Sequence, residues 1–231
     1  MSERIVVTGS SRGIGRAIAE RLAAPGRELI LHGRDAAALK LAEASVVARG
    51  AAARTVRGDL AKHDTIRHLV AAVGANTLAA VVNNAGGAVV KPVEALSRAE
   101  WEESLGVGVT APFLLVQALL PRLAPGSSIV NVMSVAARRG FSGWSAYCAA
   151  KFALEGFAQA LREELRGRGV RVINVYPAAT NTALWDGVAG AWPRERMIAP
   201  AEVAEAVAYA LSRPPGVLVE SVEVGDVSGP L

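Results

Sequence analysis

Short apolar runs alternate with longer amphipathic segments along this chain of 231 residues. The short runs are rich in Val, Ile, Leu and Ala, which is typical of strands buried on both faces. We expect strands at residues 4–8, 28–33, 52–57, 78–83, 127–134, 170–176 and 217–224. We expect the helices between them to begin near residues 13, 36, 61, 97, 144 and 201.

This alternation with short connections indicates an α/β fold, with a parallel sheet covered by helices on both faces. No repeat, linker or low-complexity segment interrupts the pattern, so we expect residues 1–231 to form one domain with a sizeable core. Ligands of such a sheet bind beyond the carboxyl ends of its strands.

Composition narrows the possible partners. The net charge of +4 comes from scattered arginines without a basic run, so we expect no nucleic-acid partner. The sequence shows neither a signal core nor a run of about 18 apolar residues, so we expect a cytoplasmic protein without a membrane partner. The single cysteine, Cys148, rules out an internal disulfide, and the three histidines lack metal-ligand spacing, so we expect no metal.

A glycine-rich turn follows the first expected strand and precedes an amphipathic helix. It reads Thr8-Gly9-Ser10-Ser11-Arg12-Gly13-Ile14-Gly15. Gly9 allows a tight turn, Gly13 lets a pyrophosphate approach the backbone, and Gly15 brings the helix close to the strand. Because the helix N-terminus also offers free N–H groups, this order predicts a dinucleotide site.

A second motif combines a tyrosine, a lysine and a serine. Tyr147 and Lys151 lie one helical turn apart, and Ser134 lies thirteen residues before Tyr147. A neighbouring ammonium favours the phenolate and lowers the phenol pKa from its usual value of about 10. Such a tyrosine gives or takes a proton near neutral pH, as a carbonyl reductase or alcohol dehydrogenase requires.

From about residue 4 to residue 224 the chain resembles the short-chain dehydrogenase/reductase family. The motifs that carry the resemblance, in order, are the glycine turn above, Asn83-Asn84-Ala85-Gly86, Ser134, Tyr147 to Lys151, and Tyr176-Pro177-Ala178-Ala179-Thr180-Asn181-Thr182. The resemblance implies a single Rossmann domain, a doubly wound seven-stranded parallel sheet, with a short substrate loop at about residues 183–199.

The resemblance also implies hydride transfer between a nicotinamide and a carbonyl or secondary alcohol. Tyr147 would be the general acid/base, and Ser134 would hold the carbonyl oxygen. Lys151 would lower the Tyr147 pKa and bind the nicotinamide ribose. Metal ions would take no part.

The cofactor residues carried over from the family lie at several strand ends. Asp59 and Leu60 would lie near the adenine, Asn84 and Gly86 near the two riboses, while Asn83 would tie neighbouring strands together. The full expected set is Gly9, Ser11, Arg12, Ile14, Arg34, Asp59, Leu60, Asn84, Gly86, Tyr147, Lys151, Thr180 and Thr182.

The end of the second strand bears on the choice between NADP(H) and NAD(H). Selective relatives place an acid at this position, where the chain has Gly33 followed by Arg34. Two guanidiniums, Arg12 and Arg34, suit a dianionic 2′-phosphate, and Asp35 is then expected to cap the next helix. We therefore expect NADP(H) rather than NAD(H); the alternative is a pair of arginines on a solvated rim.

One position departs from the family. Relatives carry an Asn in the fourth helix whose region holds a water for proton transfer to Lys151, and this chain has Gly108. Glycine adds backbone freedom that costs roughly 0.5–1 kcal/mol in a helix. We expect slower proton resupply with the chemistry retained.

The substrate is not named by the sequence. The loop at about 183–199 and the residues before Tyr147 carry Phe141, Trp144, Leu184, Trp185, Trp192, Pro193 and Met197, which could line an apolar aromatic pocket. Trp144 could equally pack in a subunit interface. Arg138 and Arg139 follow Ser134 and could meet an acidic substrate or lie at the surface.

Three hypotheses follow. The first is an NADPH-dependent oxidoreductase acting on a small or medium carbonyl or alcohol. The second is a reductase for 3-oxoacyl-carrier-protein or polyketide intermediates. The third is an NADPH-binding sensor without turnover. By analogy with relatives we expect a homodimer or homotetramer.

Overall fold

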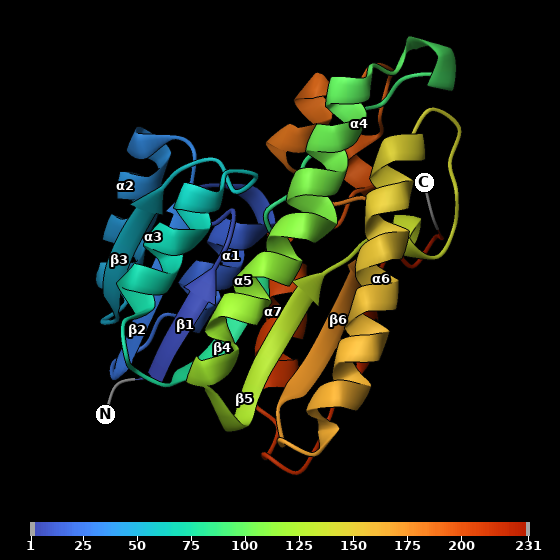
Figure 1. The fold of residues 1–231 in the computed structure, drawn as a ribbon. Coiled ribbons are helices and arrows are strands. Elements are labelled where there is room, and N and C mark those ends of the chain that lie inside the picture. Colours follow the sequence, from blue (N-terminus) through green and yellow to red (C-terminus); the bar gives the residue numbers. More distant parts are fainter. Residues whose placement is uncertain (1–2, 230–231) are drawn as a thin grey trace.

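The computed structural model describes residues 3–229, which contain one seven-stranded parallel sheet in the order β3-β2-β1-β4-β5-β6-β7 (Figure 1). The strands are β1 Glu3–Val7, β2 Arg27–Gly33, β3 Ala52–Arg57, β4 Leu78–Asn83, β5 Leu123–Val132, β6 Arg171–Pro177 and β7 Ser221–Val224. The order reverses between β1 and β4, which makes the sheet doubly wound. The α/β prediction is confirmed.

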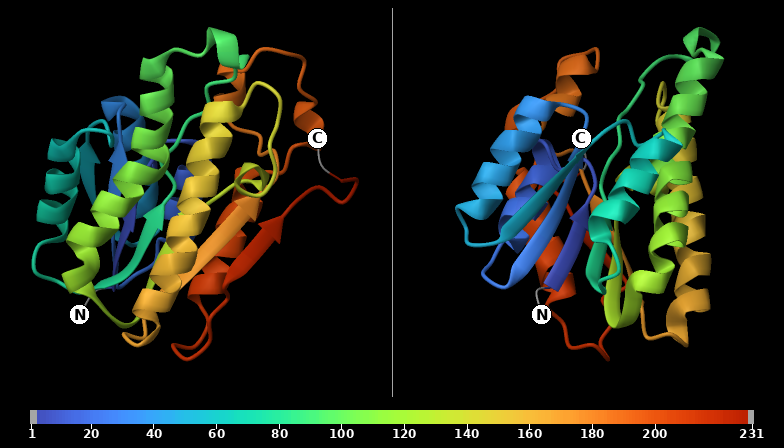
Figure 2. Two further views of the ribbon diagram at one scale, coloured as in Figure 1. Left: turned by 45° about the vertical axis from the view of Figure 1, so that its right-hand side comes forward. Right: turned by 60° about the vertical axis from the view of Figure 1, so that its left-hand side comes forward.

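Helices cover both faces of the sheet (Figure 2). The α-helices are α1 Gly13–Leu22, α2 Ala36–Val47, α3 His63–Val73, α4 Arg98–Leu105, α5 Ala111–Leu119, α6 Ser145–Arg166 and α7 Pro200–Leu211. Two separate clusters of buried apolar side chains form the core: one lies under α3, α5 and α6, the other under α1, α2 and α7. Burial on both faces explains why the strands read as continuous apolar runs.

Two strands, β5 and β7, differ from the prediction by more than one residue at an end. β5 begins at Leu123, where its pairing with Leu78 precedes a register shift, and it ends at Val132, so that Ser134 lies beyond the strand. β7 covers only Ser221–Val224, because the expected start at Val217 lies in an exposed turn after Pro214.

The expected fourth helix contains a π-helical segment. Gly106–Thr110 joins α4 to α5, and Gly108 in this segment packs directly on α6. A Cβ placed on Gly108 would lie 2.7 Å from the Cβ of Ala150, the neighbour of Lys151. The absence of a side chain at position 108 therefore lets the two helices approach beside the predicted catalytic lysine.

The same helical run bears on the expected absence of a membrane span. Arg98–Arg122 is long and apolar enough to cross a membrane by length and composition, with a mean hydropathy of 1.6 in its most apolar window. Polar residues such as Thr110 and Gln117 interrupt this segment, so it contains no unbroken run of about 18 apolar residues. In this structure α5 packs on the sheet through Leu115, Val116 and Leu119, which are fully buried.

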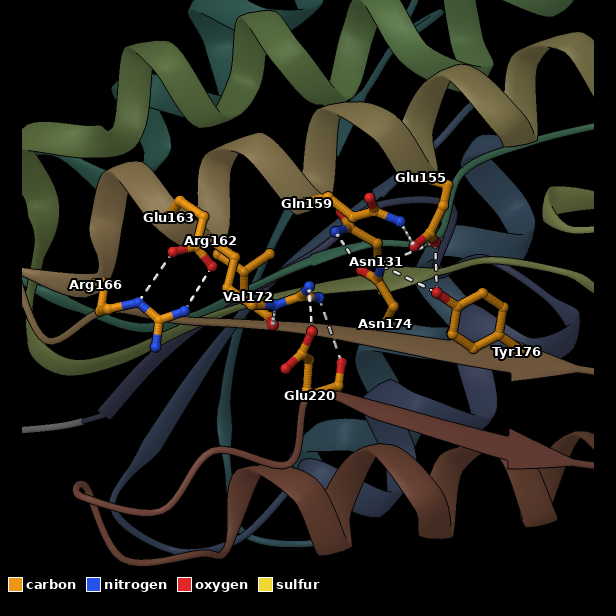
Figure 3. Close-up of polar contacts among 10 residues, drawn as sticks. All are labelled: Asn131, Glu155, Gln159, Arg162, Glu163, Arg166, Val172, Asn174, Tyr176 and Glu220. Carbon is orange, nitrogen blue, oxygen red and sulfur yellow. Dashed lines mark hydrogen bonds and ion pairs between the residues drawn. The ribbon is translucent and has the colours of Figure 1, made fainter.

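A row of asparagines ties three central strands together. Asn83 donates to Asn131 over 2.9 Å, and Asn131 donates to Asn174 over 3.0 Å, because these residues lie opposite one another in register. Asn174 and Tyr176 then both donate to the Glu155 carboxylate on α6 (Figure 3). The predicted structural role of Asn83 is confirmed.

Candidate functional site

The glycine turn is shaped by positive φ angles that favour glycine. Gly9 has φ 65° and Gly13 has φ 57°. A Cβ on Gly9 would lie 2.8 Å from the Cα of Ala85, so the turn touches the segment after β4. The turn leads into α1, which begins at Gly13.

Thr8 and Asn84 fix this turn against the neighbouring strand. The Thr8 hydroxyl accepts hydrogen bonds from the backbone N–H groups of Asn84 and Ala85, and the Asn84 side chain donates to the carbonyls of Thr8 and Gly9. Asn84 therefore braces the turn as well as lining the cavity described below. Thr8 belongs to the glycine-rich turn, but the sequence alone did not indicate that its side chain braces that turn.

His32 is a second residue whose role the sequence did not indicate. Its ring is buried, and its Nδ1 lies 3.3 Å from the Gly9 amide while its Nε2 lies 3.1 Å from the Gly58 carbonyl. Burial lowers the pKa of the imidazole, which keeps it neutral, so that Nδ1 accepts and Nε2 donates. His32 thus links the glycine turn to the end of β3.

A continuous cavity of about 700 Å³ lies at the carboxyl ends of the strands. Its lining includes every predicted catalytic and cofactor residue: Gly9, Ser11, Arg12, Ile14, Arg34, Asp59, Leu60, Asn84, Gly86, Ser134, Tyr147, Lys151, Thr180 and Thr182. Side chains from six different strand ends therefore converge on one space, as expected for an open α/β sheet.

At one end of the cavity, β2 ends at Gly33, so position 33 carries no carboxylate. A Cβ on Gly33 would lie 2.8 Å from the Ser11 Oγ, so Ser11 already fills the space that a side chain at position 33 would need. Asp35 accepts from the Ala38 amide over 3.1 Å and caps α2, as predicted. Arg12 and Arg34 are exposed and line the cavity.

At the middle of the cavity, Ser134, Tyr147 and Lys151 come together. Ser134 lies just after β5 and lines the same cavity as Tyr147, and its hydroxyl accepts a hydrogen bond from the Ala136 amide over 3.1 Å. The Lys151 ammonium is buried, donates to the Val132 carbonyl over 2.7 Å, and lies 5.8 Å from the centre of the Tyr147 ring. One strand end and one helix face thus position all three groups.

The pKa of Tyr147 differs from the prediction in direction. Burial raises the pKa of the phenol, and the nearby Ser134 hydroxyl offsets this only in part. Burial also lowers the pKa of Lys151 to about 8. The spacing of Tyr147 and Lys151 indicates a nearby ammonium, but it does not show how much water both groups lose on burial. The expected lowering of the Tyr147 pKa by Lys151 is therefore wrong for the chain without cofactor.

At the other end of the cavity, aromatic side chains gather beyond Tyr147. Trp144, Trp185 and Trp192 lie within 6.5 Å of one another, measured between ring centres, and all three line the cavity. Arg139 also lines it, with its guanidinium 4.7 Å from the centre of the Phe141 ring. Arg138 instead packs on Tyr176 and pairs with Glu223, away from this space.

The predicted substrate loop is held in place by Arg194. This arginine donates to the Asn181 side chain over 3.1 Å and to the Thr182 carbonyl over 2.7 Å, and it also pairs with Asp186. The loop contains two short helical turns, Ala183–Gly187 and Arg194–Arg196.

Comparisons with known proteins agree with the motifs and the fold. Residues 3–190 match the family model of the short chain dehydrogenases. The chain is 33% identical to the D-threitol dehydrogenase of Mycolicibacterium smegmatis, over 90% of this chain and 85% of that protein.

Solved structures give the same result. An alcohol dehydrogenase from Thermococcus sibiricus, complexed with 5-hydroxy-NADP, is 27% identical with a TM-score of 0.90, covering 100% of this chain and 99% of that one. An angucycline C-6 ketoreductase with bound NADP is 28% identical with a TM-score of 0.87, covering 98% of this chain and 96% of that one. With its motifs gathered in one cavity and the family model matching most of its length, this chain belongs to the short-chain dehydrogenase/reductase family of oxidoreductases.

Proposed function

We propose that this protein is an NADP(H)-dependent reductase of carbonyl compounds, with Tyr147 as the general acid. The observation that carries the proposal is that one cavity joins Arg12 and Arg34 at one end to Ser134, Tyr147 and Lys151 at its middle. Two similar structures, one with bound 5-hydroxy-NADP at 27% identity and one with bound NADP at 28% identity, support the choice of cofactor.

The residues present fit a dinucleotide. Gly9 and Gly13 leave their backbone bare where the cavity meets the start of α1, and the helix N-terminus offers its N–H groups to phosphates. Arg12 and Arg34 would hold the 2′-phosphate, because position 33 has no carboxylate to repel it. Asp59 and Leu60 would lie beside the adenine, while Asn84, Gly86, Thr180 and Thr182 would line the ribose and nicotinamide end.

Each catalytic residue has a distinct task. When bound, the nicotinamide cofactor would supply a hydride to the carbonyl carbon. Tyr147 gives its phenolic proton to the carbonyl oxygen, which yields an alcohol, while Ser134 donates a hydrogen bond to that oxygen as charge develops on it. Lys151 would hold the nicotinamide ribose and place a positive charge near the phenol.

The protonation state of Tyr147 suits a general acid. Because burial raises the pKa of this phenol, it is protonated at neutral pH and is ready to act as an acid.

Two alternatives remain from the sequence. Reduction of a carrier-bound 3-oxoacyl or polyketide intermediate uses the same chemistry, and the likeness to an angucycline ketoreductase favours it. A sensor that binds NADPH without turnover is disfavoured because Ser134, Tyr147 and Lys151 are all present in one site.

We also propose a homodimer or homotetramer. On the face formed by α5 and α6, Phe113 is 40% exposed and Phe152 is 47% exposed, and only 28% of the apolar window within Arg98–Arg122 is buried. Such a large apolar face is typical of a protein–protein interface. The cytoplasmic location and the absence of nucleic-acid and membrane partners stay predictions.

The direct test is NADPH consumption with a panel of ketones, aldehydes, 3-oxo esters and 3-oxoacyl thioesters, each also run with NADH. Turnover with NADPH and a free ketone supports the proposal, whereas turnover of thioesters alone favours the carrier-bound alternative. Tight NADPH binding without turnover of any compound would favour the sensor.

A further inference from the structure

Three tryptophans form one wall of the cavity on the far side of Tyr147. Trp144 precedes Tyr147 in the chain, and its ring centre lies 5.6 Å from the Tyr147 ring. Trp185 and Trp192 come from the loop after β6, with ring centres 4.7 Å apart. All three side chains are half-buried, so part of each ring faces the cavity. We call Trp144, Trp185 and Trp192 the tryptophan wall.

The polar atoms of the two loop tryptophans are already used by the protein. The Trp185 indole donates to the Thr180 carbonyl over 3.0 Å, and the Trp192 indole donates to the Ala189 carbonyl over 3.3 Å. These bonds fix how the two rings are turned. The surface left for a ligand is therefore the carbon surface of the rings, which recognises shape and aromatic character rather than a hydrogen-bonding group.

The charge near the wall excludes one kind of ligand. Several aromatic rings around a space also bind organic cations. Here, however, the Arg139 guanidinium lies on Phe141 in the same cavity and would repel a cation. A neutral or anionic flat ring has no such penalty.

We propose that the substrate carries its carbonyl group on a flat aromatic or fused-ring system that packs against the tryptophan wall. This inference rests on the proposed reductase function, since the carbonyl must reach Tyr147 while the ring contacts Trp144, Trp185 and Trp192. The tilted rings of the wall, at 52° and 57° to one another, offer both faces and edges, the arrangement that aromatic pairs prefer.

The test compares two ketones of nearly equal size, aromatic 1-tetralone and saturated 1-decalone. With the protein–NADPH complex, kcat/KM is measured for turnover and, separately, Kd is measured by calorimetry. The wild type is expected to prefer 1-tetralone by both measures. Trp192→Leu should lower this preference by about 2- to 10-fold, the value of one aromatic contact, and Trp192→Phe should restore most of it.

Trp101→Leu is the matched control, because Trp101 lies on α4 outside the cavity lining and is 38% exposed. It should leave the ratio between the two ketones unchanged. Equal kcat/KM and Kd for both ketones in the wild type, or an unchanged ratio in Trp192→Leu, would overturn the inference while leaving the reductase function intact. Selective binding of 1-tetralone without turnover of either ketone would support the inference and contradict the reductase function instead.

Discussion

Two exposed arginines, Arg12 and Arg34, are expected to decide the cofactor preference. Each is expected to contribute a charge-assisted contact to the 2′-phosphate, and NADH lacks that group. A hydrogen bond to a charged group contributes about 1.5–3 kcal/mol. Arg34→Ala should therefore raise the Kd for NADPH by about 10-fold or more and leave the Kd for NADH nearly unchanged.

Calorimetry with both cofactors measures this, and Arg67→Ala is a control, because Arg67 is an exposed arginine on α3 that does not line the cavity. An equal loss of affinity for NADPH and NADH in Arg34→Ala would contradict the assignment of this arginine to the 2′-phosphate.

Lys151 is expected to give the fold an unusual pH dependence. Its pKa is lowered from 10.5 to about 8 by burial, so the folded chain releases a proton that the unfolded chain keeps up to about pH 10.5. Stability rises with pH wherever the unfolded state binds more protons. Relative to Lys151→Met, the wild type should therefore gain free energy of unfolding between about pH 8 and pH 10.5, by at most about 3 kcal/mol.

Urea unfolding of both proteins without cofactor, at several pH values across this range, measures the difference. Comparing the two proteins cancels the effect of alkaline pH on all other groups. A difference that is constant with pH would show that Lys151 keeps an ordinary pKa in the folded chain.

At the scale of the elements, the contact between the π-helical segment and α6 depends on Gly108. A side chain there meets the Ala150 Cβ, which belongs to a helix and has no rotamer to adopt. Gly108→Asn, which would restore the residue of the relatives, is therefore expected to destabilise the protein by about 1–3 kcal/mol through overpacking.

The double variant Gly108→Asn with Ala150→Gly removes the clashing methyl group. After correction for the effect of Ala150→Gly alone, the double variant should recover most of the stability lost in Gly108→Asn. Thermal unfolding of the wild type, the two single variants and the double variant gives this double-mutant cycle. If Gly108→Asn is as stable as the wild type, position 108 has more room than the structure gives it.

At the scale of the whole molecule, the apolar face of α5 and α6 predicts self-association. Phe152→Glu places a charge in the middle of this face and should shift the protein toward a monomer in light scattering coupled to gel filtration. Leu41→Glu is the control, since Leu41 is 61% exposed on α2, far along the sheet on the opposite layer. A wild-type protein that is monomeric at high concentration would contradict the proposed oligomer.

Much of the architecture was predictable because it depends on local patterns. Apolar runs and glycine turns predicted the order of strands and helices. The motifs at the strand ends predicted residues that line the cavity, such as Ser134 and Tyr147. The π-helical segment was missed because Gly106 and Gly108 read as ordinary helix with weak propensity. His32 was missed because its two partners, Gly9 and Gly58, lie far from it in sequence.

The sign of the Tyr147 pKa was missed for a related reason. A spacing rule shows which charge is near, whereas desolvation depends on everything that covers the site. The tryptophan wall is an intermediate case, since the sequence named its residues but left open whether Trp144 lines the pocket or an interface.

The central claim is that Tyr147 transfers the proton in a carbonyl reduction that uses NADPH. The most direct measurement is a single-turnover reaction of the protein–NADPH complex with a ketone, for the wild type and Tyr147→Phe, together with the Kd for NADPH of both proteins. The account predicts that Tyr147→Phe binds NADPH nearly as tightly but reduces the ketone about 100- to 10,000-fold more slowly. Equal rates in the two proteins would contradict it.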